Sequence, residues 1–324
     1  MHSKRRLKVV VTRRWPMPVE VRMAELFDAE FNLSDHPLDE KGLAGAVSDS
    51  DVLVPTLGDR ISAKVISAGG NRLRLIANFG VGIDHIDLES ARARGIIVTN
   101  TPGALTEDTA DLAMTLVLSI ARRFSEGEAM LRRGEWKGWA PTDLLGRSLT
   151  GKALGVVGMG RIGQALARRA RACGLSIHYH NRGRLPEPVE KSLDARYWPK
   201  LDDMMPKIDI LSINCPATPE THHLIEERRL SLMKGDAFLI NTARGDIVDQ
   251  DALIAALERG TIAGAGMDVY VGEPHVDARL LKLGNVRLLP HMGSATLETR
   301  TAMGEKVITN ITALARGEDP PDRC

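Results

Sequence analysis

The chain has 324 residues, of which 43 are Lys or Arg and 42 are Asp or Glu. This near balance excludes a charge-driven nucleic-acid or membrane partner, and the length allows two domains with complete cores. The three cysteines show no paired or metal-ligand spacing, and no stretch reaches the roughly 18 apolar residues of a membrane span. These features indicate a cytoplasmic protein without a metal site.

Short apolar runs alternate with amphipathic segments along the first hundred residues. The predicted strands are 7–11, 51–54, 73–77 and 96–99, and the predicted helices are 19–27, 63–68 and 88–94. This rhythm favours a parallel sheet covered by helices. The basic residues around the first strand, among them Lys4, Arg5 and Arg6, are interpreted as its solvated flank instead of a nucleic-acid arm.

A longer helical pattern covers residues 106–124, and the Gly, Trp and Pro content of residues 134–150 predicts a loop. The strand–helix rhythm then resumes, with predicted strands 208–213, 237–241, 262–267 and 286–289 and predicted helices 201–205, 226–233, 249–258 and 295–316. The Pro- and charge-rich tail, 317–324, is expected to be disordered. The fold class is therefore α/β, with two doubly wound parallel-sheet domains (Rossmann-like or flavodoxin-like) and the active site in the cleft between them.

Residues 152–182 carry the most specific local motif of the chain. Gly158, Gly160 and Gly163 follow the apolar run 153–157 in the spacing G-x-G-x-x-G, and a helical pattern and an alternating strand come next. Three glycines alone are a weak signal, but this context predicts a dinucleotide site with the pyrophosphate at the helix N-terminus. The alternative is a tight turn without a ligand.

The end of the strand after this helix predicts which dinucleotide is bound. An NAD-preferring site has Asp or Glu at this strand end, about 20 residues after the glycine motif, and this acid hydrogen-bonds the ribose 2′-hydroxyl. This chain has Asn181, followed by Arg182 and Arg184, so a 2′-phosphate meets no acid and gains two guanidiniums. We predict NADPH as the preferred cofactor, with NADH used at lower efficiency; in the alternative, both arginines point into solvent.

Polar residues at the predicted carboxyl ends of strands form a candidate catalytic site, because ligands of open α/β sheets bind there. Arg244 and His291 each follow a strand, and Glu273 lies in the loop after Asp268. Arg244, or the backbone N–H groups of the glycine turn 80–82, can hold the carboxylate of a 2-keto acid. His291 can protonate the keto oxygen, and Glu273 would stabilise its imidazolium. Taken singly, each could equally be a surface charge or a core residue.

Several longer segments of the chain form a combined pattern. They include NFGVGIDHIDL (78–88), TPGALTEDTADLA (101–113), GVVGMGRIGQALA (155–167), LINTARGDIVDQDAL (239–253), GAGMDVYVGEP (264–274) and LPHMGSAT (289–296). Together they resemble the D-2-hydroxyacid dehydrogenases, and most closely their NADP-dependent glyoxylate/hydroxypyruvate reductases. The match covers nearly the whole chain from about residue 50.

The resemblance implies a discontinuous substrate domain, residues 1–102 with 291–324, and a dinucleotide-binding Rossmann domain, residues 103–290. It implies that His291 is the proton donor, that Glu273 supports it, and that Arg244 holds the substrate. The expected reaction is the NADPH-dependent reduction of glyoxylate to glycolate and of hydroxypyruvate to D-glycerate. The expected partners are this small 2-keto acid and a second copy in a homodimer.

The resemblance also implies further site residues. The expected substrate-binding residues are Val81, Gly82, Trp139, Arg244, His291 and Ser294. Trp139 either enters the pocket of the other subunit, as in mammalian-type glyoxylate reductases, or packs within its own chain. The expected cofactor-binding residues are Thr109, Gly158, Gly160, Arg161, Ile162, Gly163, Asn181, Arg182, Arg184, Cys215, Pro216, Thr221, Thr242, Ala243, Asp268 and Gly293.

Two other interpretations stay open. A broader D-2-hydroxyacid dehydrogenase would act on larger 2-keto acids, since sequence does not measure the pocket. A dinucleotide-sensing, corepressor-like binding protein would keep the same Arg, Glu and His residues. The chain shows neither a long interaction tail nor a strongly basic composition, which favours the enzyme.

Overall fold

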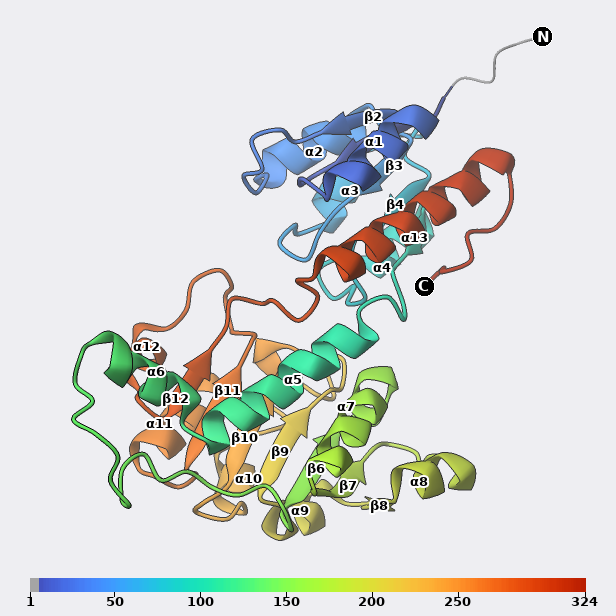
Figure 1. The fold of residues 1–324 in the computed structure, drawn as a ribbon. Coiled ribbons are helices and arrows are strands. Elements are labelled where there is room, and N and C mark those ends of the chain that lie inside the picture. The colour runs from blue at the N-terminus through green and yellow to red at the C-terminus, as the bar shows by residue number, and fades with distance from the viewer. Residues whose placement is uncertain (1–5) are drawn as a thin grey trace. The chain divides into compact units, whose positions relative to one another are not determined.

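The computed structural model describes residues 6–324, so Lys4 and Arg5 of the basic flank lie outside the described residues. The chain divides into two compact units (Figure 1). Unit 1 contains the described residues up to Leu105 together with Ser294–Cys324, and unit 2 is Thr106–Gly293. Each unit has its own parallel sheet and its own core.

Unit 1 has a five-stranded parallel sheet with the order β2-β1-β3-β4-β5. The strands are β1 (Lys8–Val11), β2 (Asp28–Phe31), β3 (Val52–Val54), β4 (Leu75–Ala77) and β5 (Ile97–Thr99). The helices are α1 (Met17–Leu26), α2 (Glu40–Ser48), α3 (Ala63–Ala68), α4 (Leu88–Ala93) and α13 (Leu297–Arg316). Alternate strand residues face opposite ways: Val52 and Leu75 pack with α1 and α13, and Leu53 and Ile76 pack with α2, α3 and α4.

Two elements of unit 1 escape the sequence patterns. The β2 sequence DAEF has two exposed acids, Asp28 and Glu30, and no apolar run, because β2 is an edge strand. Helix α2 buries only Leu43 and Val47, too narrow a stripe to give a clear helical period.

The expected disorder of residues 317–324 is wrong. Cys324 N donates to Val98 O at 2.9 Å, so the tail pairs with the open edge of β5. The Asp322 carboxylate accepts from Lys306 Nζ at 3.1 Å and from Asn310 Nδ2 at 3.1 Å, both on α13. A charged residue of the tail therefore forms specific contacts with α13, and composition alone does not reveal such contacts.

Unit 2 has a seven-stranded parallel sheet with the order β12-β11-β10-β9-β6-β7-β8. Its strands are β6 (Ala153–Val157), β7 (Ser176–His180), β8 (Ala195–Tyr197), β9 (Ile210–Ile213), β10 (Phe238–Asn241), β11 (Gly264–Met267) and β12 (Val286–Leu288). Its α-helices are α5 (Thr106–Ala121), α6 (Phe124–Arg132), α7 (Arg161–Ala172), α8 (Glu187–Leu193), α9 (Leu201–Met204), α10 (Glu227–Ser231), α11 (Gln250–Glu258) and α12 (Ala278–Lys282).

Both faces of this sheet are covered, which is why its strands read as continuous apolar runs. Helices α5 and α7 pack on one face with Leu154 and Val156, and α9, α10 and α11 pack on the other with Leu211 and Leu239. The strand order reverses between β6 and β9, the place where such sheets bind ligands. The predicted fold class, two doubly wound parallel-sheet domains, is confirmed.

Helices α6, α8 and α12 and strand β8 of unit 2 are not predicted by the sequence. Helix α6 buries no residue, so it has no apolar stripe to detect. Helix α8 is a short, charged segment, EPVEKSL, that buries Glu190 and Leu193. Within residues 6–324, no helix combines the length and the apolar character needed to cross a membrane.

Candidate functional site

The turn between β6 and α7 requires glycine at two of its positions. Gly158 has a φ of 93°, and a Cβ there would lie 2.5 Å from the Cys215 nitrogen after β9. A Cβ on Gly163 would lie 2.4 Å from the Gly158 oxygen. Gly160 has a φ of −80°, and a Cβ there would meet no atom of the described chain within 4 Å. This open space at the N-terminus of α7 suits a pyrophosphate, with the N–H groups of Arg161 and Ile162 in the first helical turn.

Asn181, at the end of β7, supports the glycine turn. Its Oδ1 accepts a hydrogen bond from Met159 N at 2.7 Å, and its carbonyl accepts one from the Tyr197 hydroxyl at 3.3 Å. Arg182 next to it is exposed, whereas Arg184 donates to the carboxylate of Glu190 on α8. No carboxylate therefore follows β7 directly, and one of the two arginines already has an acidic partner.

Two polar atoms at the ends of β9 and β10 point to a bound ligand. Asn214 Oδ1 and Thr242 Oγ1 are buried, and neither has a hydrogen-bond partner within the described chain. Such a group left unpaired costs about 1–3 kcal/mol, so a ligand that pairs with it is favoured. Burial raises the pKa of the Cys215 thiol to about 11, which keeps it neutral. The residues present thus fit a dinucleotide.

Glu273 and His291 form a close pair in unit 2. His291 Nδ1 lies 2.7 Å from Glu273 Oε2, and Glu273 Oε1 accepts from Tyr270 N at 2.8 Å. Burial pushes the pKa of Glu273 up, but the hydrogen bond and charge of His291, the Tyr270 N–H and the charge of Arg244 outweigh it. The pKa of Glu273 therefore lies below its ordinary value, and the carboxylate is charged at neutral pH.

Arg244 comes to the same edge of the sheet as this pair, because it follows β10, next to β11 and β12. Asn241 Nδ2 donates to Arg244 O at 2.8 Å, and Arg244 Nη1 donates to Ala243 O at 2.7 Å. A Cβ on Gly245 would lie 2.1 Å from the Tyr270 carbonyl carbon. The Arg244 loop thus packs directly on the backbone that leads to Glu273.

Asp268 fixes the loop that carries His291. Its carboxylate accepts from Met292 N at 2.8 Å and from Gly293 N at 2.9 Å, and Thr109 Oγ1 donates to Gly293 O at 3.0 Å. His291 has a φ of 50°, a left-handed conformation that costs a side chain about 1–3 kcal/mol. The Asp268 hydrogen bonds hold the loop in this conformation, although burial raises the pKa of Asp268.

In unit 1, the turn 79–82 after β4 directs its carbonyl groups into the protein. Asn78, which is fully buried, donates from Nδ2 to Gly80 O at 3.0 Å and to Gly82 O at 2.9 Å. Asn100 Nδ2 donates to Val81 O at 2.8 Å. These contacts hold the carbonyls of the turn, and successive backbone N–H groups of such a turn can bind an anion.

The remaining predicted residues are placed as follows. Thr221 Oγ1 donates to Pro216 O at 2.8 Å and shapes the loop after β9. Ser294 begins the second part of unit 1, and its carbonyl accepts from Thr296 N at 2.9 Å. Trp139, in the loop after α6, is 84% exposed. Sequence patterns give Asn100 and Tyr270 no role; Asn100 directly follows a predicted strand and the strand-end rule could have found it.

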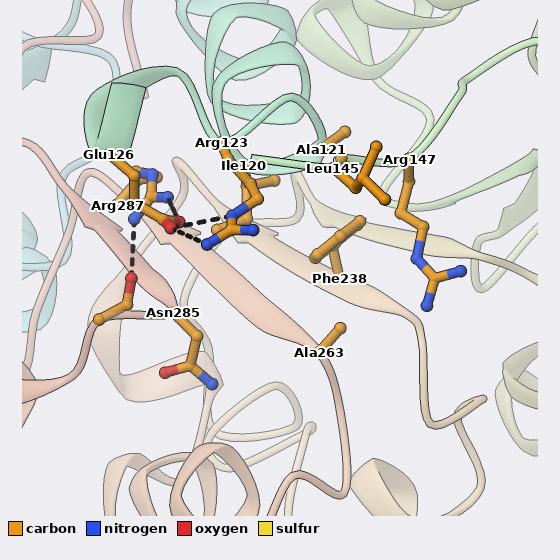
Figure 2. Close-up of a pocket in the computed structure, with 12 residues that line it drawn as sticks. Ile120, Ala121, Arg123, Glu126, Leu145, Arg147, Phe238, Ala263, Asn285 and Arg287 are labelled. Atoms are coloured by element: carbon orange, nitrogen blue, oxygen red, sulfur yellow. Dashed lines mark hydrogen bonds and ion pairs between the residues drawn. The ribbon is translucent and has the colours of Figure 1, made fainter. Parts of the chain in front are cut away.

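A cavity of about 440 Å³ lies elsewhere in unit 2, at the amino ends of β10, β11 and β12, beside Phe238, Ala263 and Asn285. Figure 2 shows Arg123 and Arg287 converging on the Glu126 carboxylate there, each at 2.5 Å. Because ligands of such sheets bind at the carboxyl ends of strands, this cavity is not assigned to catalysis.

Comparison with known proteins decides the family. Residues 114–293 match the family described as D-isomer specific 2-hydroxyacid dehydrogenase, NAD binding domain. The chain belongs to this family. The dehydrogenase is thus an oxidoreductase with a nicotinamide dinucleotide as its cofactor.

Relatives of this dehydrogenase match it over nearly the full length. The glyoxylate reductases of Thermococcus onnurineus and Thermococcus litoralis are 45% and 46% identical; the alignments cover 97% of this chain and 94% and 96% of theirs. A solved structure from Polaromonas sp. is 42% identical, with a TM-score of 0.92 over 98% of this chain and 99% of that one. The NADPH-dependent glyoxylate/hydroxypyruvate reductase of Sinorhizobium meliloti, solved with NADP and malonate, is 36% identical, with a TM-score of 0.88 over 98% and 97%.

Replacing Gly158 or Gly160 with alanine should affect different properties of the protein. G158A places a Cβ at positive φ against backbone, so the ligand-free protein should lose about 1–3 kcal/mol of unfolding free energy. G160A should leave that stability within about 1 kcal/mol of wild type but weaken dinucleotide binding, because its Cβ occupies the open space. Urea unfolding and titration calorimetry measure the two effects. Wild-type affinity in G160A would show that the pyrophosphate lies elsewhere.

Proposed function

We propose that this dehydrogenase reduces small 2-keto acids with NADPH, converting glyoxylate to glycolate and hydroxypyruvate to D-glycerate. The observation that carries the proposal is the 2.7 Å contact of His291 Nδ1 with Glu273 Oε2 at the edge of the sheet that also holds Arg244. An acid–base pair and a fixed cation are what the reduction of a keto acid needs. Relatives 45% identical are named glyoxylate reductases, which supports the substrate class.

The chemical roles follow from the contacts. A bound nicotinamide supplies the hydride that the keto carbon receives. His291 keeps Nδ1 on Glu273 and donates the proton of Nε2 to the keto oxygen as negative charge develops there. The keto group thereby gains one hydride and one proton and becomes a hydroxyl. Glu273, charged at neutral pH, stabilises the imidazolium before the transfer.

The proposal gives the substrate carboxylate two kinds of anchor. The Arg244 guanidinium binds a carboxylate through paired N–H donors. The backbone N–H groups of Val81 and Gly82 add neutral donors, since Asn78 and Asn100 hold the carbonyls of their turn away. Ser294 is assigned to the same carboxylate by resemblance to the family.

NADPH is the proposed cofactor because of the residues that follow β7. Asn181 stands directly after β7 where an NAD-preferring site has an acid, and its side-chain oxygen accepts from Met159 N, so this position does not repel a 2′-phosphate. Arg182 is exposed in the loop 181–186, and Arg184 lies in the same loop. NADH, which lacks the phosphate, would be used with lower efficiency.

We also propose a homodimer formed through unit 2. Six large apolar side chains are exposed along the segment from α5 to the loop after α6: Leu118, Phe124, Leu131, Trp136, Trp139 and Leu145. An apolar surface of this kind marks an interaction site. A second copy that covers it would bury Trp139, which is otherwise the most exposed of these side chains.

A steady-state screen tests the proposed function. Glyoxylate and hydroxypyruvate should be reduced faster with NADPH than with NADH, and methyl pyruvate, which has no carboxylate, should be a poor substrate. H291A should lose at least about 100-fold in kcat and still bind NADPH. Efficient turnover of methyl pyruvate would contradict the proposed carboxylate anchors. Normal turnover in H291A would contradict the role of His291 as proton donor.

Replacing Glu273 with Gln should slow reduction. Gln keeps the size of the side chain but removes the charge that faces His291 Nδ1, so the proton donor loses its electrostatic partner. The kcat of E273Q should fall by about tenfold or more in steady-state assays. E258Q, which changes an exposed acid of α11, is the control and should keep the wild-type kcat. An unchanged kcat in E273Q would contradict the assigned role of Glu273.

Acidic substitutions on the proposed dimer interface test the homodimer. Sedimentation velocity should give twice the chain mass of 35.3 kDa for wild type. F124E/L131E places two carboxylates on α6 and should give the single-chain mass, because burying unpaired charge is costly. L281E, on the exposed side of α12, should remain a dimer. A monomeric wild type would reject the proposal.

A further inference from the structure

Glu190 is a buried acid beneath the loop that follows β7. Its side chain is 7% exposed, whereas Glu187 on the same helix, α8, is 72% exposed. Removing a carboxylate from water is costly unless cations and hydrogen-bond donors replace the water. The contacts of Glu190 therefore show what the acid is for.

Three segments meet at the Glu190 carboxylate. Arg184 Nε lies 3.0 Å from each of its oxygens, and Arg184 Nη2 lies 2.7 Å from Oε2. The Tyr179 hydroxyl, from β7, donates to Oε1 and accepts from Leu185 N at 3.0 Å. The carboxylate thus ties β7 and the loop 181–186 to α8.

The protonation states suit this arrangement. The hydrogen bonds of Arg184 and Tyr179 hold the pKa of Glu190 below its ordinary value, so the acid is an anion at neutral pH. Burial, together with the Glu190 hydrogen bond, raises the pKa of Tyr179 to about 12, so the hydroxyl keeps the proton that it donates. The cluster is a charge-assisted network whose buried members all have partners.

Both ends of the loop 181–186 are consequently fixed. At its start, Asn181 is held by Met159 N and the Tyr197 hydroxyl. At its end, Arg184 and Leu185 are held by Glu190 and Tyr179. Arg182 and Gly183, between the two anchors, are exposed and do not take part in these contacts. A loop held in this way loses less conformational entropy when it binds a ligand.

We propose that Glu190 is a positioning residue for cofactor choice, which fixes the loop 181–186 so that Arg182 and Arg184 face the 2′-phosphate of NADPH. This inference rests on the proposed preference for NADPH. An acid directly after β7 would accept the ribose 2′-hydroxyl and repel a phosphate. Glu190 has the opposite effect, because it is buried on α8 and its charge is directed at Arg184.

Binding of 2′,5′-ADP and of 5′-AMP to the full chain tests the proposal without turnover. Titration calorimetry should show tighter binding of 2′,5′-ADP by wild type. E190Q keeps the size of the side chain and removes its charge; it should weaken 2′,5′-ADP by about tenfold or more and change 5′-AMP by less than about twofold. E187Q removes a charge from the exposed side of the same helix and should leave both affinities unchanged.

Each other outcome rejects a specific statement. Unchanged or tighter binding of 2′,5′-ADP by E190Q would overturn the positioning role, since Arg184 would then act better without its acid. A wild type that binds both ligands equally would overturn the NADPH preference itself, while keto acid reduction is tested separately. Y179F keeps the Glu190–Arg184 pair and removes only the tie to β7 and Leu185. It should show a smaller loss of the same sign, and decides the matter if E190Q does not fold.

Discussion

The close approach between the β6–α7 turn and the end of β9 is the constraint on which the site depends. Strands β6 and β9 are neighbours. From β6 the chain continues to β7 and β8 on one side of the sheet, and from β9 it continues to β10, β11 and β12 on the other side. Gly158 makes this contact feasible, because any Cβ there would meet the Cys215 backbone. The same reversal opens the edge at which the loops after β10, β11 and β12 bring Arg244, Glu273 and His291 together.

Acids with several partners restrain these loops, and two of them, Asp268 and Glu190, are buried. Asp268 binds two backbone N–H groups next to His291, Glu273 binds His291 and one N–H group, and Glu190 binds Arg184 and a tyrosine hydroxyl. A carboxylate removed from water is stable only when its partners stay in place. Because moving a partner away would leave a buried charge unpaired, these acids hold in place the residues that would bind substrate and cofactor.

Much of the fold and the centre of the site can be predicted from the sequence. Strands buried on both faces, such as 153–157, give continuous apolar runs, and the helices that cover them give a period near 3.6. The elements that the patterns miss lack such a core-facing stripe: β2 is an exposed edge strand, and α6 buries nothing. Arg244 and His291 are predictable because each lies in the short loop after a strand, a position that local sequence reveals.

The sequence by itself determined the fold class, the glycine turn and the residue types at the strand ends, since each depends on neighbours in the chain. Only the tertiary structure decided which groups touch. In the structure, Glu273 contacts His291, and Arg184 donates to Glu190. Asp322 in the tail binds Lys306, and Asn100 donates to the carbonyl of Val81. Glu273 and His291 are separated in sequence by intervening elements, as are Val81 and Asn100. Even for nearer pairs such as Arg184 and Glu190, a hydrogen bond depends on distance in space, which no local period encodes.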